Sequence, residues 1–183
     1  MNKKRLNNAG FTLIELLAVI TIMGILMMVA IPAVSRTIEN SRRDSFATVA
    51  QNYINAVRNA VLADELTCDG VNVSAVQSDK VYYLEINSST ASSNSKAQQT
   101  ADLMESGGNS PWGGATVEGF VKWEKSGSSH SGQWEYEITL VDTGKHGISS
   151  YTRDQKIKRA QVSVNNASNA GAPSGGVECT YTG

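Results

Sequence analysis

An almost unbroken apolar run near the N-terminus, NNAGFTLIELLAVITIMGILMMVAIPAV at residues 7–34, constrains the chain more than any other feature. A helix of about 20 apolar residues crosses the hydrocarbon core of a bilayer, and the part from Phe11 to Val34 is long enough to do so. The run exceeds the apolar core of about 7–15 residues in a cleavable secretory signal. No cleavage site of small residues follows it at a suitable distance, so the sequence predicts a helix that anchors the chain in a membrane.

Basic residues lie on both sides of this run, so their charge alone does not set the orientation of the anchor. They are Lys3, Lys4 and Arg5 before the run and Arg36, Arg42 and Arg43 after it.

Glu15 lies inside the apolar run, where a carboxylate is costly. On insertion scales a charged residue at the centre of a membrane helix costs about 2.5–3.5 kcal/mol, and such residues usually mark a specific partner. The run holds no Lys, Arg or His that would pair with Glu15 in the same helix. If the chain were cut between Gly10 and Phe11, the new α-amine at Phe11 would be a cation at neutral pH and would pair with Glu15 of a neighbouring copy. Because buried ion pairs set register more than they add stability, we expect Glu15 to fix the axial offset between copies.

The residues KKRLNNAGFTLIELLAVITIMGILMMVAIPAV closely resemble the N-terminus of type IV pilins and the related pseudopilins. The matching features are a short basic leader, Gly10 before the scissile bond and Phe11 after it, Glu15 within TLIELL, and Pro32 about two-thirds of the way through the segment. The resemblance covers roughly residues 3–62. The remainder matches the family in layout more than in sequence.

This resemblance implies a processing and assembly route. A membrane-embedded prepilin peptidase, an aspartic protease, would cleave after Gly10 on the cytoplasmic side and N-methylate Phe11. The chain would be a single-pass membrane protein with its C-terminal domain outside the cytoplasm. An assembly ATPase and a polytopic platform protein would then extract it from membrane lipid into a helical filament of identical copies. Gly10 suits the scissile position because a backbone without a side chain fits a narrow protease cleft.

An amphipathic pattern continues the helix beyond the apolar run. Apolar residues recur at steps of three and four, as expected for one buried helix face. They are Ile38, Phe46, Val49, Ala50, Tyr53, Val57, Ala60 and Val61. The pattern predicts a single helix that ends around Ala63 to Leu66, is kinked or loosened at Pro32, and allows close helix approach at Gly24. The alternative is that Pro32 ends the anchor and a separate helix begins near Ser35.

The rest of the chain predicts a loop region followed by a sheet. KVYYLEI (80–86) fits a short strand or a helical turn, NSSTASSNSKAQQT (87–100) a surface loop, and SGGNSPWGG (106–114) a breaker cluster in which Trp112 would plug the core edge. Strands are expected at 116–125, 133–142 and 159–166, with an edge strand at 177–181.

An antiparallel sheet of three or four such strands, packed on the amphipathic half of the helix, gives an α+β class and the type IV pilin fold. The expected division is a cleaved leader at 1–10, a transmembrane and filament-core helix at 11–34, its amphipathic continuation at 35–66, an αβ-loop at 67–114, and the sheet with the C-terminal segment at 115–183.

Cysteine and histidine usage favours a disulfide over a metal site. The chain has two cysteines, Cys68 and Cys179, and an even number in an exported chain suggests one disulfide. Two unpaired thiols are the alternative. Two cysteines and the scattered His130 and His146 lack metal-ligand spacing, and both histidines are expected to be solvated loop residues. Asp142 fits a plain turn better than a calcium loop.

No catalytic motif or phosphate-binding loop occurs in the sequence, so we expect neither an enzyme nor a cofactor. The KIKRAQ cluster (156–161) is expected to be a solvated strand edge rather than a nucleic-acid site. The leading hypothesis is a structural subunit of a type IV pilus that serves adhesion, motility or DNA uptake. The alternatives are a pseudopilin of a type II secretion or competence system and, from another class, a membrane-tethered extracellular binding domain that never polymerises. Glu15 favours the first two, because a simple anchor gains nothing from a buried carboxylate.

Overall fold

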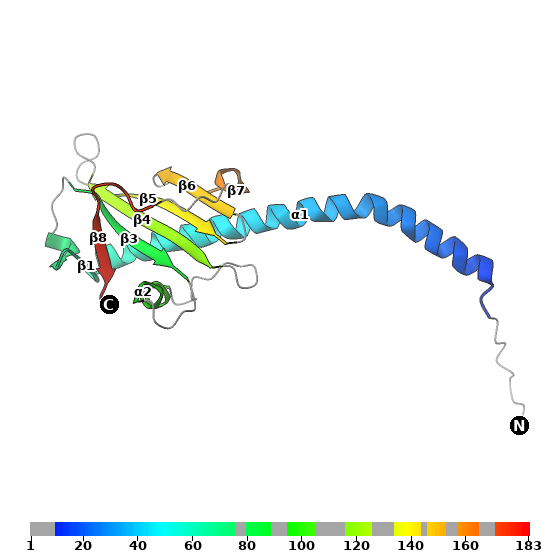
Figure 1. The fold of residues 1–183 in the computed structure, drawn as a ribbon, viewed down its shortest axis with the longest axis horizontal. Coiled ribbons are helices and arrows are strands. Elements are labelled where there is room, and N and C mark those ends of the chain that lie inside the picture. The colour runs from blue at the N-terminus through cyan, green and yellow to red at the C-terminus, as the bar shows by residue number, and fades with distance from the viewer. Residues whose placement is uncertain are drawn as a thin grey trace, which may run out of the picture. The chain divides into compact units, whose positions relative to one another are not determined.

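The computed structural model describes residues 10–75, 80–88, 95–104, 116–125, 134–143, 146–152, 157–164 and 171–183. The chain divides into two compact units, Met1–Asn40 and Ser41–Gly183. One long helix, α1 (Leu13–Leu62), begins in the first unit and ends in the second (Figure 1).

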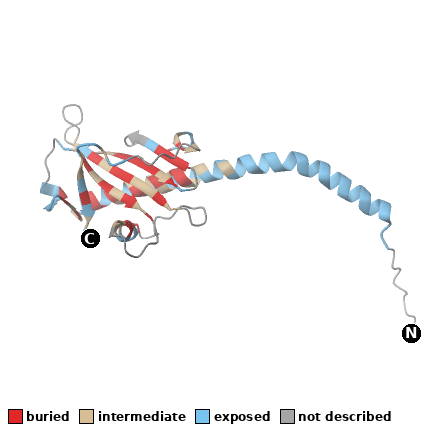
Figure 2. Ribbon diagram, viewed as in Figure 1, coloured by how far each residue is buried: buried red, intermediate tan, exposed pale blue. Residues whose placement is uncertain are grey.

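The first unit consists of the apolar part of α1, and its side chains are exposed all around the helix (Figure 2). The most apolar window of 18 residues in α1 has a mean hydropathy of 2.6, and none of it is buried. By length and composition this helix is able to cross a membrane. The helix continues through Pro32, so the alternative of a separate helix beginning near Ser35 is wrong. The kink at Pro32 stays a prediction.

The second unit buries the predicted face of α1 beneath a sheet. Seven helical residues are buried there: Phe46, Ala47, Ala50, Tyr53, Val57, Ala60 and Val61. Six of them belong to the predicted stripe, which is therefore confirmed from Phe46 to Val61, while Val49 packs at its margin. The prediction is wrong for Ile38, which is 45% exposed. The helix ends at Leu62, one residue before the predicted range.

In the part of the chain that the structure describes, the sheet of the second unit has eight strands rather than three or four. They are β1 (Leu66–Cys68), β2 (Val71–Asn72), β3 (Tyr82–Asn87), β4 (Val117–Lys125), β5 (Trp134–Asp142), β6 (His146–Thr152), β7 (Ser163–Val164) and β8 (Val177–Tyr181). Their order is β2-β1-β8-β3-β4-β5-β6-β7, and every neighbouring pair is antiparallel except β3 and β8. The α+β class with a long N-terminal helix and an antiparallel-rich sheet is confirmed. The prediction of an edge strand at 177–181 is wrong, because β8 lies between β1 and β3.

Two further segments differ from the sequence prediction. Part of the predicted surface loop at 87–100 forms α2 (Ser95–Leu103), whose Ala97 and Thr100 are buried. The predicted strand at 159–166 begins instead with a 3₁₀ turn, η2 (Arg159–Gln161), before the two residues of β7. A second such turn, η1 (Val73–Ala75), follows β2. The breaker cluster with Trp112, and His130, lie outside the described residues.

The core lies between the sheet and α1. Alternate residues of β3, β4 and β5 face the helix: Leu84, Ile86, Val117, Val121, Trp123, Ile138 and Leu140 are all almost fully buried. Gly119 of β4 has a φ of +155° and lies against β5. A Cβ at this position would lie 2.1 Å from the carbonyl oxygen of Thr139. Only glycine fits this contact, because both the backbone angle and the space exclude a side chain.

Candidate processing and assembly site

The predicted cleavage junction lies immediately before α1. Gly10 and Phe11 are both exposed, and the Phe11 side chain is 91% accessible. A Cβ at Gly10 would meet nothing within 4 Å. The junction is therefore outside the helical hydrogen-bond ladder, where an extended backbone can enter a protease.

Thr12 and Glu15 form a reciprocal cap at the start of α1. The Thr12 backbone N–H and the Thr12 Oγ1 hydroxyl each donate to Glu15 Oε2 at 2.8 Å. In return, the Glu15 backbone N–H donates to Thr12 Oγ1 at 3.3 Å. Thr12 is the residue before Leu13 and Glu15 is the third helical residue, so this is a capping box that satisfies two otherwise orphaned backbone donors. A carboxylate in the first turn also interacts favourably with the positive end of the helix dipole.

The capping box gives Glu15 a partner that the sequence reasoning missed. The spacing T-x-x-E before an apolar run is a known N-terminal signature and would have identified Thr12. An ionised carboxylate has about four lone-pair positions, and the Thr12 bonds use two of them. Glu15 therefore retains acceptor capacity for a cation while it caps its own helix.

The structure places the cleavage junction just before α1 and Glu15 in its first turn, whereas Gly24 and Pro32 lie farther along the helix. At 1.5 Å per residue, Gly24 and Pro32 lie about 14 and 26 Å further along the helix axis than Glu15. A Cβ at Gly24 would meet nothing within 4 Å, so the exposed helix surface there is open to close approach by another helix.

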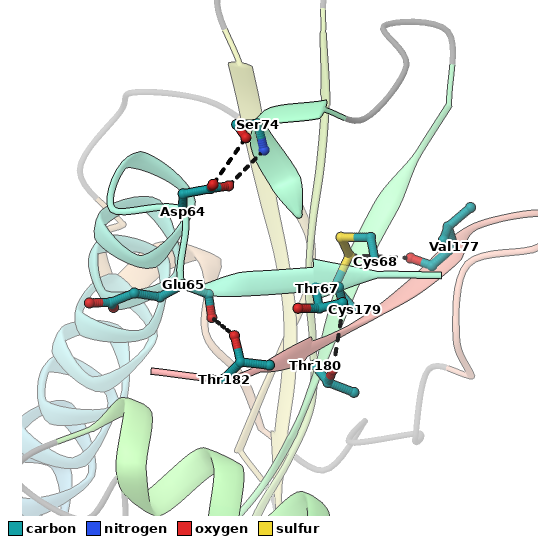
Figure 3. The surroundings of a disulfide bond; sticks show 9 residues. All are labelled: Asp64, Glu65, Thr67, Cys68, Ser74, Val177, Cys179, Thr180 and Thr182. Atoms are coloured by element: carbon teal, nitrogen blue, oxygen red, sulfur yellow. Dashed lines mark hydrogen bonds between the residues drawn. A yellow bond between two sulfur atoms is a disulfide. The ribbon is translucent and has the colours of Figure 1, made fainter. Parts of the chain in front are cut away.

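A disulfide joins Cys68 of β1 to Cys179 of β8, which are directly opposite each other in the sheet (Figure 3). Their Cα atoms are 4.1 Å apart and both residues are buried. The prediction of a disulfide is confirmed, and the alternative of two unpaired thiols is wrong. The bond closes a chain segment with a sequence separation of 111, so it ties the C-terminal strand to the end of α1.

Hydrogen bonds near the disulfide join the residues that follow α1 to the C-terminal segment and to η1 (Figure 3). The Thr182 backbone N–H and hydroxyl both donate to the Glu65 carbonyl, at 2.9 and 3.0 Å. Asp64 accepts from the backbone N–H and the hydroxyl of Ser74, at 2.8 and 3.0 Å. These bonds, led by the Ser74 backbone N–H, lower the pKa of Asp64 below its ordinary value.

His146 is buried at the start of β6, so the prediction of a solvated loop residue is wrong for it. Its backbone N–H donates to Asp142 Oδ1 at 2.8 Å, and its ring Nδ1 lies 3.3 Å from Asp142 Oδ2. Asp142 thus closes the turn between β5 and β6. Within the described ranges, no group of three or more His, Cys, Asp or Glu side chains that could hold a metal ion occurs.

Comparison with known proteins identifies the N-terminal segment. Residues 5–31 match a family model described as the prokaryotic N-terminal methylation motif. This motif is the class III signal of type IV pilins and pseudopilins, and the match includes the cleavage junction, Thr12 and Glu15. Neither the search of curated proteins nor the search of solved structures gives a match to the chain.

The motif supports a pilin-like or pseudopilin precursor, a structural and non-enzymatic kind of protein, and it implies processing by a peptidase and assembly into a pilus. Together with the one long apolar helix, it fits a membrane-anchored protein with an extracellular domain.

Proposed function

We propose that the chain is a structural subunit of a type IV pilus, cleaved after Gly10, N-methylated at Phe11 and polymerised through α1 into a surface filament that serves adhesion, motility or DNA uptake. The observation that carries this proposal is the position of the methylation motif at residues 5–31: its part from residue 13 onward lies in α1, whose apolar surface there is exposed on every side.

The exposed surface of α1 requires two apolar environments in succession. Before assembly, membrane lipid covers the side chains between Phe11 and Val34, because a helix of this length and hydropathy partitions into a bilayer. After extraction, only the same helices of other copies can keep this surface from water. An assembly ATPase and its platform protein supply the work of moving the helix from one environment to the other.

Glu15 sets the register of that assembly. Cleavage creates an α-amine at Phe11, which is a cation at neutral pH. In the apolar filament core, this amine and the remaining lone pairs of Glu15 on a neighbouring copy satisfy each other. Unpaired, each would carry a large desolvation cost, so one axial offset between copies is favoured over all others.

The chain then divides functionally into a leader (1–10), a filament-core helix (11–34), its amphipathic continuation (35–66), an αβ-loop (67–114) and a C-terminal sheet segment (115–183). The αβ-loop also contributes β2, β3 and most of β1 to the sheet. Gly24 and Pro32 belong to the core helix, where they adapt it to its neighbours. A pseudopilin of a secretion or competence system is the second candidate, since the same motif heads both kinds of subunit. A non-polymerising tethered binding domain is the third candidate. The capping box removes one argument against it, because a simple anchor would also use Glu15 as a cap.

Cleavage at Gly10 provides the test. In cells that contain a prepilin peptidase, we expect sheared surface filaments to contain the chain without residues 1–10. The variant Gly10→Val should remain full-length in the membrane fraction and give no filaments, because its side chain blocks the scissile position. The matched control Asn7→Val places the same side chain in the leader but away from the scissile bond, and it should be processed normally. Filaments built from uncleaved Gly10→Val chains would overturn the proposal.

A further inference from the structure

A groove with a volume of about 750 Å³ lies in the second unit between α1 and the segment around η2. The helix contributes Arg43, Asp44 and Thr48, and the segment contributes Ile157, Lys158 and Arg159.

Three contacts hold this segment against the helix, so the groove is a built feature. Arg159 binds Asp44 in a two-point ion pair, with Nε to Oδ1 at 2.9 Å and Nη2 to Oδ2 at 2.6 Å. The Ile157 backbone N–H donates to Gln51 Oε1 at 3.2 Å, and the Ile157 side chain is buried in the core. The planar fork of Arg159 fixes its position more firmly than a lysine would.

The groove is positively charged although its unit is acidic. Arg43, Lys158 and Arg159 against Asp44 give its lining a formal charge of +2. The chain has 16 basic and 17 acidic residues, of which four and two lie in the first unit. The second unit, Ser41–Gly183, therefore has 12 basic and 15 acidic residues and a net charge of −3. The groove therefore departs in sign from the rest of its unit.

Acidic residues gather at the opposite end of the same unit. Asp64, Glu65 and Asp69 follow the end of α1, and Asp69 is exposed at the tip of the hairpin between β1 and β2. Lys80 lines a small pocket with Asp69, so this acidic end has a formal charge of −2. From Asp44 to Asp64 the chain follows α1 almost throughout, which places the two charged surfaces about 30 Å apart along the helix.

We propose that the basic groove of one copy binds the acidic end of a second copy, so that Arg43, Lys158 and Arg159 face Asp64, Glu65 and Asp69 of that chain. This second copy is offset by about 30 Å along the filament, and it is therefore not the neighbour that pairs through Glu15. This inference rests on the proposed filament. The two described surfaces have opposite signs and lie at different ends of the unit, so the contact is heterologous, and in the proposed filament it repeats without closing into a ring. The opposite charges suppress wrong alignments of the domains and favour the correct encounter. They supply a second register device outside the apolar core.

The groove and the acidic end are tested together by neutralising one side chain on each. Lys158→Gln removes a cation that is exposed at the groove, and Asp69→Asn removes a carboxylate at a position with φ +53° that Asn also adopts readily. Lys158→Arg keeps the charge, and Glu118→Gln removes a half-buried carboxylate from β4 that lines neither the groove nor the pocket of Asp69 and Lys80, so these two are the matched controls. Normal cleavage after Gly10 and an intact Cys68–Cys179 disulfide verify that each full-length variant has been processed and folded.

The measurement is the fraction of subunit that still sediments as filament after a low-salt wash. We expect each single neutralisation to reduce this fraction about twofold to fivefold, as for loss of an exposed ion pair. The double variant should sediment no less than the single variant with the lower fraction, because the two charges share one contact. Wild-type filaments should weaken similarly in about 1 M salt, where the Debye length is about 3 Å.

Four results would overturn the inference. If the two singles behave like the controls, or if their effects multiply in the double variant, the two surfaces do not meet. If Lys158→Gln alone weakens the filament, the groove takes another anion, such as a phosphate or a lipid headgroup. A wild-type chain that never leaves the membrane fraction would overturn the proposed function as well, whereas filaments that ignore these charges overturn the docking inference alone.

Discussion

At the scale of single residues, Glu15 has two roles that one substitution separates. Gln at the third helical position also completes a capping box, so Glu15→Gln keeps the bonds from Thr12 and removes only the charge. If the charge pairs with the Phe11 amine of another copy, the amine is left buried and unpaired at a cost of about 3–5 kcal/mol. We therefore expect filament recovery in the sheared fraction to fall about a hundredfold or more.

Thr12 gives the complementary variant. Thr12→Val removes the hydroxyl that donates to Glu15 but leaves the charge, at a cost of about 1 kcal/mol for a lost helix cap. We expect about a fivefold fall in filament recovery, with Thr12→Ser close to wild type. If Glu15→Gln assembled normally and Thr12→Val did not, Glu15 would be a cap only, and its role in setting register would be refuted.

Gly119 controls the approach of β4 to β5. Because a Cβ at this position would lie 2.1 Å from the Thr139 carbonyl oxygen and φ is +155°, Gly119→Ala forces the two strands apart. We expect a loss of about 2–4 kcal/mol in the free energy of unfolding, measured by urea denaturation of the detergent-solubilised chain. Gly171→Ala, where a Cβ would meet nothing within 4 Å, is the control and should unfold like wild type. Equal stability of the two variants would show that the strands are not packed as described.

At the scale of elements, the sequence predicted those whose pattern is local. The buried stripe of α1 follows from apolar steps of three and four, and the alternation of Trp134 to Leu140 identifies β5. The hairpin between β1 and β2 was missed, although Asp69-Gly70 is a strong turn signal and both residues have positive φ. In α2, a polar composition concealed the two buried positions Ala97 and Thr100.

The central position of β8 was not predictable from local pattern. The strand pairs in parallel with β3 and in antiparallel with β1, and both pairings join residues that are far apart in sequence. Such pairings depend on tertiary contacts and, here, on the disulfide between Cys68 and Cys179. In the candidate site, the cleavage junction and Glu15 were recognised from their spacing. Thr12 was overlooked, although the spacing T-x-x-E before an apolar run is the signature of the capping box that it forms with Glu15.

The link between the end of α1 and η1 should respond to acid. Hydrogen bonds from Ser74, the backbone N–H first, lower the pKa of Asp64 in the folded chain. Stability from these bonds is therefore present above the ordinary Asp pKa of about 3.9 and is lost as the pH falls through the folded value. We expect the Tm of wild type to drop more steeply than that of Asp64→Asn below about pH 4, as followed by circular dichroism. Parallel curves for the two proteins would contradict this account of Asp64.

At the scale of the whole molecule, the disulfide closes most of the second unit. For a loop with a sequence separation of 111, the chain-entropy estimate of its contribution is about 4–5 kcal/mol. We expect the double variant Cys68→Ala with Cys179→Ala to lose about this much free energy of unfolding, measured by urea denaturation without reductant. The wild-type chain should resist reduction until it unfolds, because both cysteines are buried. Rapid reduction of the folded chain would contradict the burial of this bond.

The central claim is that one apolar helix is released from a leader and then packs with copies of itself outside the cell. Intact mass spectrometry of non-reduced protein from sheared surface filaments tests it most directly, together with sequencing of the N-terminal peptide. The account predicts a chain that starts at N-methyl-Phe11 and weighs two hydrogens less than its reduced form, because Cys68 and Cys179 are bonded. A chain that still starts at Met1 and occurs only in the membrane fraction would contradict it.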